Sequence, residues 1–170
     1  MSATDYIIDS ALVLLVLLQL KERTLTTKAL VRPLIIVAIA VANYLHGFPT
    51  QGNDIELIAV IGAIGTVIGV ASGVAVKMRR GEHGEVLARA GTSSAIFWVL
   101  GMGSRFAFAV WAASAAGSHS IGQFSAQHSI TSAEAWTVAL LAMAVCEVAS
   151  RSLVMAARRE RMMTAALALA

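Results

Sequence analysis

The chain consists of five long apolar runs that shorter polar segments separate. The runs cover about residues 5–20, 29–46, 54–76, 87–116 and 132–157. A helix needs about 20 mostly apolar residues to cross the roughly 30 Å hydrocarbon core of a bilayer. Because backbone amides in lipid must find partners within their own segment, each run should be helical. The pattern predicts an all-α fold, a single transmembrane domain over residues 1–170 that forms a five-helix bundle.

Charged residues are too few for a soluble domain of this size. They make up 14% of the chain, against 58% hydrophobic residues, whereas an ordinary soluble domain carries roughly 25% charged residues. We therefore expect an integral membrane protein. The single cysteine, Cys146, excludes an intramolecular disulfide and a zinc cluster built from thiolates.

Residues at the junctions predict where three of the helices begin. Pro33 suits the first turn of the second helix, where its missing N–H costs nothing. Asn53 with Glu56, and Thr131 with Glu134, have the spacing of N-terminal capping boxes. These pairs predict the starts of the third and fifth helices.

Basic residues cluster in the polar segments and predict the topology. Of the 13 Lys and Arg, all but Arg105 lie in or beside the 21–32 connection, the 77–89 connection and the segment after residue 157. Lys and Arg near helix ends are retained on the cytoplasmic side, which predicts an outer N-terminus and a cytoplasmic C-terminus. Without a basic region ahead of it, the first run is expected to stay as an anchor. The net charge of +3 then reflects topology, and no nucleic-acid partner is expected.

The third run carries glycines spaced four residues apart. Gly65, Gly69 and Gly73 form a groove on one helix face, which lets a neighbouring backbone approach closely. That neighbour is either another helix of the same chain or a second copy. A homodimer through these three glycines is therefore one of two expectations.

Ionisable groups at membrane depth are the main candidates for function. Arg105 lies sixteen residues beyond Arg89, about 24 Å along a helix and so near the outer end. Asp9, Asp54 and Glu56 fall at the same level, and a charge inside the membrane normally faces a partner, the bundle interior or water. We expect an outer polar pocket in which Arg105 pairs with one of these carboxylates. The alternative is that the carboxylates only cap helices or that the pair is structural.

An aromatic stripe surrounds Arg105 on the fourth run. Trp98, Gly101, Arg105 and Phe108 share one helix face by their three- and four-residue spacing. Such a surface suits a ligand with an apolar body and an anionic or carbonyl head. Trp111 and Trp136 are also explained by the aromatic belts that mark membrane interfaces. The candidate ligand-binding residues are Arg105, Asn43, His46, Trp98, Phe108 and Trp111.

A second pair of charges lies in the fifth run. Glu147 precedes Arg151 by four residues, the favoured order for an ion pair on a helix. The pair is either an internal salt bridge or, with the arginine distant, a carboxylate that carries a proton.

Metal and cofactor chemistry is not indicated. The histidines lack the spacing of a helical metal site, and neither a nucleophile elbow nor a zinc-protease motif occurs. A composite metal centre of His46, His119 and His128 is the weaker alternative. We expect no metal and no cofactor.

Three functions fit these residues. The first is a membrane protein that binds or moves an amphipathic or anionic small molecule through the outer pocket, with Arg105 as anchor. The second is a membrane-embedded enzyme, an acid-initiated isomerase or a terpene or isoprenoid cyclase, which needs a neutral buried carboxyl group and aromatic faces. The third is a structural subunit of a membrane complex. The candidate catalytic acids are Asp9, Asp54, Glu56 and Glu147.

The order of several motifs resembles a known family. These are Lys21-Glu22-Arg23, then Arg32-Pro33, a glycine-rich third run, a charged turn before Arg89-Ala90-Gly91, and Trp98 with Arg105. Over roughly residues 15–110 the chain resembles the small bacterial CcdC-like integral membrane proteins. The resemblance implies a bacterial multi-pass protein of the inner (cytoplasmic) membrane and carries no activity with it.

Overall fold

The computed structural model describes residues 23–44, 49–82, 84–89 and 91–167. Most of this part of the chain is helical. The elements are β1 (Arg23–Thr24), α2 (Thr27–Tyr44), α3 (Asp54–Ala75), β2 (Lys77–Arg80), β3 (Val86–Arg89), α4 (Thr92–Ala112), α5 (Ala115–Gln127) and α6 (Ala133–Leu167). The first predicted run, at residues 5–20, lies outside the described residues.

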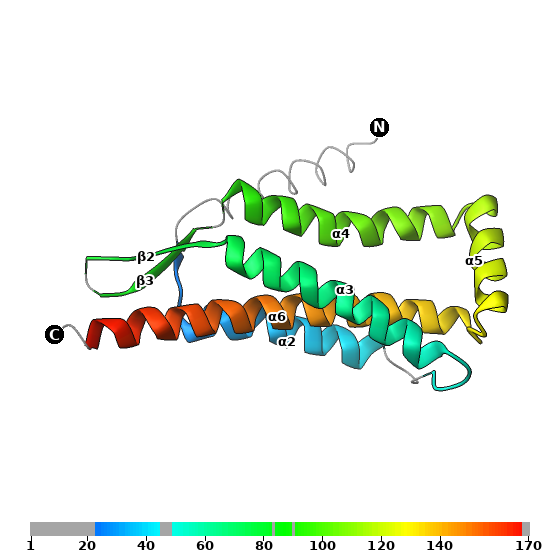
Figure 1. The fold of residues 1–170 in the computed structure, drawn as a ribbon, viewed down its shortest axis with the longest axis horizontal. Coiled ribbons are helices and arrows are strands. Elements are labelled where there is room, and N and C mark those ends of the chain that lie inside the picture. Colours follow the sequence, from blue (N-terminus) through cyan, green and yellow to red (C-terminus); the bar gives the residue numbers. More distant parts are fainter. Residues whose placement is uncertain (1–22, 45–48, 83, 90, 168–170) are drawn as a thin grey trace.

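Four helices run along the long axis of the molecule, with α5 across one end and the strands at the other (Figure 1). Three of the described helices are long and apolar enough to cross a membrane: α3, α4 and α6 over Ala133–Ala165. The helix α2 lies where the second span was predicted but is not among these three. Five spans and their orientation stay predictions.

Large apolar side chains point outward from the long helices. Ile36 on α2, Val67 on α3 and Phe106 on α4 are 61%, 68% and 72% exposed. Soluble proteins rarely expose apolar surface over whole helices, and hydrocarbon is the solvent that suits it. The exposed side chains thus agree with the composition in indicating a membrane-embedded protein.

A small antiparallel sheet forms at the end opposite α5. The strands β2 and β3 pair from Lys77 with Arg89 to Arg80 with Val86, and β1 adds to the other edge of β3. The prediction that the fourth helix begins at about residue 87 is therefore wrong, since α4 begins at Thr92. Val86 is only 4% exposed and packs in a small apolar core with strand and helix neighbours. This core buries the apolar segment within the protein instead of in lipid.

The connection predicted over residues 117–131 is largely a helix. Residues Ala115–Gln127 form α5 after a sharp turn in which the Ser114 hydroxyl accepts a hydrogen bond from the Gly117 N–H, at 3.0 Å. A Cβ on Gly117 would overlap the carbonyl oxygen of Trp111. The turn thus needs glycine at this position, and α4 ends at Ala112 instead of near residue 116.

The helix starts differ in detail from the predicted ones. The helix α2 begins at Thr27, where Thr26 Oγ1 accepts from the Ala29 N–H at 3.2 Å, so Pro33 falls in the second turn. At α6 the capping hydroxyl belongs to Ser132, which accepts from the Ala135 N–H at 3.2 Å.

The start of α3 is also held differently from the prediction. Asn53 makes no side-chain capping bond. Its side-chain amide donates instead to the carbonyl of His128, at 3.0 Å. Asn53 therefore ties the start of α3 to the segment that leads into α6.

The glycine face of α3 packs against α6 of the same chain. A Cβ on Gly65 would overlap the backbone of Met143, and one on Gly69 would overlap the carbonyl oxygen of Glu147. The two backbones approach this closely because the glycines have no side chains. The groove is thus filled within the chain, and the homodimer through Gly65, Gly69 and Gly73 stays a prediction.

Candidate functional site

The central feature of the site is an ion pair between α4 and α6. Arg105 Nη1 donates to Glu147 Oε2 at 2.8 Å, and the two side chains are 17% and 10% exposed. A Cβ on Gly101, one turn before Arg105, would overlap the Glu147 carboxyl group. Glycine at this position therefore lets the carboxylate lie directly against α4.

This pairing differs from both ion pairs that the sequence suggested. Arg105 was expected to pair with Asp9, Asp54 or Glu56, and Glu147 with Arg151. Arg151 instead donates to Ser94 Oγ at 3.4 Å, while it stays close enough to Glu147 for electrostatic attraction.

The physical reason for the difference is depth in the bundle. Counting residues along each run assigned Arg105 to the outer third and Glu147 to the inner half. The two side chains nonetheless meet, because α4 begins only at Thr92, which brings Arg105 closer to the start of its helix than the count from Arg89 gave, and a long α6, of 35 residues, runs beside it.

One side of the Arg105 guanidinium borders an apolar cavity. Among the described residues, Nη2 donates to the sulfur of Met102, at 4.0 Å, and a thioether is only a weak acceptor. The cavity measures about 440 Å³ and lies between α3, α4 and α6. Apart from Arg105 and Ser104, its lining is apolar, with side chains such as Ile64, Leu100 and Met143. A polar head held by Arg105 would therefore have apolar surroundings for its body.

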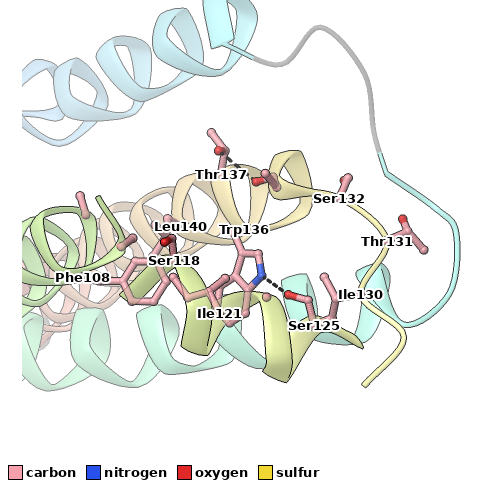
Figure 2. Close-up of a pocket in the computed structure, with 14 residues that line it drawn as sticks. Phe108, Ser118, Ile121, Ser125, Ile130, Thr131, Ser132, Trp136, Thr137 and Leu140 are labelled. Atoms are coloured by element: carbon pink, nitrogen blue, oxygen red, sulfur yellow. Dashed lines mark hydrogen bonds between the residues drawn. The ribbon is translucent and has the colours of Figure 1, made fainter. Parts of the chain in front are cut away.

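A second cavity, of about 550 Å³, lies at the α5 end of the molecule (Figure 2). It is bounded by the last turns of α4, by α5 and by the first turns of α6. Phe108, Trp136 and Leu140 line both this cavity and the one beside Arg105. The two cavities are thus neighbours that share one wall.

Aromatic rings form that shared wall. The rings of Phe108 and Trp136 are stacked, with centroids 5.4 Å apart and an interplanar angle of 23°. Trp136 Nε1 donates to Ser125 Oγ at 3.1 Å, as Figure 2 shows. This bond fixes the indole and ties α6 to α5.

Asp54 lies in a different place and has a different environment. It is fully buried, and its two oxygens accept from the backbone N–H of Thr131 at 2.8 Å and from the Thr131 hydroxyl at 2.5 Å. The Asn53 N–H also donates to the carbonyl of Ser129, at 3.1 Å. Asp54 therefore joins the start of α3 to the start of α6. It does not contact Arg105.

The remaining candidates are scattered or lie outside the described residues. Asp9 and His46 lie outside them, as do the side chains of Asn43 and Trp98. Glu56 is exposed on the first turn of α3, beside a smaller hollow of about 190 Å³ near Phe124 and His128. Trp111 contacts Phe108, with ring centroids 5.9 Å apart, but is not part of either cavity lining.

The structure thus brings together three of the predicted residues and adds others. Arg105, Glu147 and Phe108 meet at one site, while Trp136 and Leu140 were not assigned to it. Trp136 carried a signal, as a tryptophan in the first turn of an apolar run, but that position is equally typical of an interfacial belt.

Comparison of the chain with models of known protein families, with curated proteins and with solved structures finds no match. The resemblance to the CcdC-like proteins therefore stays a prediction.

Proposed function

We propose that this chain is a protein of the inner membrane that binds an amphipathic small molecule with a carbonyl or singly anionic head, and provides a path for it. The head would lie against Arg105 and the body in the cavity between α3, α4 and α6. The observation that carries the proposal is the contact pattern of one guanidinium. Among the described residues, its Nη1 bonds to Glu147, whereas the hydrogen-bond partner of its Nη2 is a thioether sulfur beside an apolar cavity.

The chemistry of arginine supports this assignment. A guanidinium presents five N–H donors in a planar fork, and a single carboxylate oxygen at one nitrogen leaves donors for a second acceptor. Carboxylates, phosphates and carbonyl groups all match this geometry. Glu147 already offsets the positive charge, so a head with one negative charge or none suits the site better than a multiply charged one.

An acid-initiated enzyme has less support from the same residues. A proton-donating acid needs a carboxyl hydrogen aimed at its substrate. Both oxygens of Asp54 accept hydrogen bonds from Thr131, and Glu147 is held by Arg105. Neither of these candidate acids is arranged to protonate a molecule in the cavities. No observation specifically favours a structural subunit.

The proposal is tested with a matched pair of amphiphiles. Dodecanoate and dodecanol are added to the protein in phosphatidylcholine nanodiscs, and the bound amount is measured by native mass spectrometry. We expect saturable binding of dodecanoate that falls about tenfold or more in Arg105→Gln, because a hydrogen bond to a charged group is lost. Dodecanol should bind more weakly and should not respond to the substitution.

Two further variants sharpen the test. Arg89→Gln removes an exposed cation of β3 and should leave binding unchanged. Glu147→Gln removes the competing carboxylate and should strengthen dodecanoate binding. Equal dodecanoate binding in Arg105→Gln and the unmodified protein would refute the proposal.

A further inference from the structure

The two cavities that share the Phe108–Trp136 wall lie one after the other along α4. Arg105 lines the first, Phe108 lines both, and Ala112 lines the second. Ala112 lies seven residues beyond Arg105, a rise of about 10 Å along the helix. Each cavity has a volume within the range of roughly 300–1,000 Å³ that is usual for small-molecule sites. Together they favour an elongated occupant over a compact one.

The second cavity is chemically suited to a hydrocarbon chain. Among the described residues its lining has no charged side chain. Its hydroxyl groups are all engaged within the protein: Ser118 with the carbonyl of Ala115, Ser125 with Trp136, Thr131 with Asp54, Ser132 with the N–H of Ala135 and Thr137 with the carbonyl of Ala133. Hydroxyl groups with such partners do not need a hydrogen bond from a ligand. The lining therefore behaves as largely apolar although it contains serine and threonine.

We infer that the occupant is a single-chain amphiphile whose chain runs from its head at Arg105 past Phe108 and Trp136 into the cavity beneath α5. This inference rests on the proposed function and extends it to the shape and orientation of the ligand. The head lies between α3 and α4, and the end of the chain lies against α5. The hydrocarbon chain of the ligand passes along the rings of Phe108 and Trp136.

A glycine on α5 offers a way to block only the far cavity. Gly122 lines that cavity, and a Cβ added there meets no atom within 4 Å. Gly122→Leu should therefore occupy space in the cavity without displacing the backbone. Gly103 on α4 is a matched control, since a Cβ there also meets no atom within 4 Å, and it lines neither cavity.

The experiment uses palmitate analogues that carry a photoreactive diazirine either near the carboxylate or near the methyl end. The full chain in phosphatidylcholine nanodiscs is irradiated with each probe, and the labelled residues are mapped by mass spectrometry. We expect the methyl-end probe to label α5 around Ile121 and Ser125, and the carboxylate-end probe to label α3 and α4 near Arg105. Gly122→Leu should reduce the α5 labelling several-fold, and Gly103→Leu should not.

The failure of this inference differs from the failure of the proposed function. If the carboxylate-end probe labels the Arg105 cavity while the methyl-end probe labels only lipid-facing side chains such as Val67 and Phe106, the chain does not enter the second cavity and only the inference is wrong. Unchanged α5 labelling in Gly122→Leu overturns it too. If neither probe labels either cavity, and labelling does not depend on Arg105, both fail together.

Discussion

The long helix α6 meets α3 on one side and α4 on another, and the two contacts differ in kind. Against α3 it packs backbone to backbone over glycines, so closely that a Cβ on Gly65 or Gly69 would overlap it. Against α4 it leaves two cavities and is joined by the Arg105–Glu147 pair. In the most apolar 18-residue stretch of α3, 33% of the residues are buried, compared with 6% in that of α4. In a membrane, close fit replaces the hydrophobic effect as the force that holds helices together. The contact of α6 with α3 is therefore the stable one, whereas its contact with α4 leaves space between the helices.

Polar contacts at the helix ends strengthen the same contrast. At its start, α3 is tied to the start of α6 by the bonds from Thr131 to Asp54. At its end, Arg158 Nη1 of α6 donates to the carbonyls of Gly73 and Val74, at 2.7 and 2.9 Å. Free carbonyls at a helix end are favourable sites for a cation. The pair of α3 and α6 is thus fixed at both ends, and α4 borders the two cavities.

The largest effect should come from filling the glycine face of α3. Gly65→Leu places a side chain where the backbone of Met143 already lies, and overpacking of this kind costs about 3 kcal/mol or more. We expect most of the variant to be unfolded. The measurement is its free energy of unfolding in mixed micelles. Gly103→Leu, on the open side of α4, is the matched control and should unfold like the unmodified protein. Similar stability of the two leucine variants would mean that α3 and α6 do not pack as tightly as described.

The next largest effect concerns the ion pair that joins α4 to α6. Arg105→Gln or Glu147→Gln leaves one mostly buried charge without its partner, which costs about 3 kcal/mol. The double variant should be clearly more stable than the sum of the single losses predicts, because no unpaired charge remains. The measurement is a double-mutant cycle on the free energy of unfolding. Additivity to within about 0.5 kcal/mol would show that the two residues do not interact.

The sequence predicts the helices better than the connections between them. Apolar runs locate α3 and α6 because no other arrangement hides so many apolar residues from water. Residues 87–89 of β3 were assigned to a helix, because a short apolar stretch next to a longer one has no period of its own. Only its pairing with β1 and β2, a long-range contact, makes it a strand. The helix α5 was missed for a related reason, since its serines and glycines are typical of loops.

The residues of the candidate site were predicted better than their pairing. Arg105 was identified because an isolated cation in an apolar run needs an explanation. Glu147 was identified as a candidate acid, but its pairing with Arg105 was not predicted, because residue counting along separate runs does not say which levels coincide when the helices differ in length and tilt. Gly101, one turn from Arg105, carried a usable signal. A small residue beside a buried charge marks the place where a partner approaches.

The smallest effect compares two truncations of similar size on the two sides of α6. Ile58 of α3 is 8% exposed and packs against Val138 and Ala139, so Ile58→Ala opens a new hole and should cost about 2 kcal/mol. Leu140 already borders two cavities, so Leu140→Ala enlarges existing space and should cost less than about 1 kcal/mol, since the cost of a truncation depends on the contacts that the removed atoms made. Thermal unfolding of both variants in the same lipid provides the measurement.

A bound single-chain amphiphile adds a second comparison. Only Leu140→Ala should weaken the stabilisation that the ligand adds, although Ile58→Ala costs more stability without ligand. If both variants lose equal stability, with and without ligand, the contacts of α6 with α3 and with α4 do not differ in the way described.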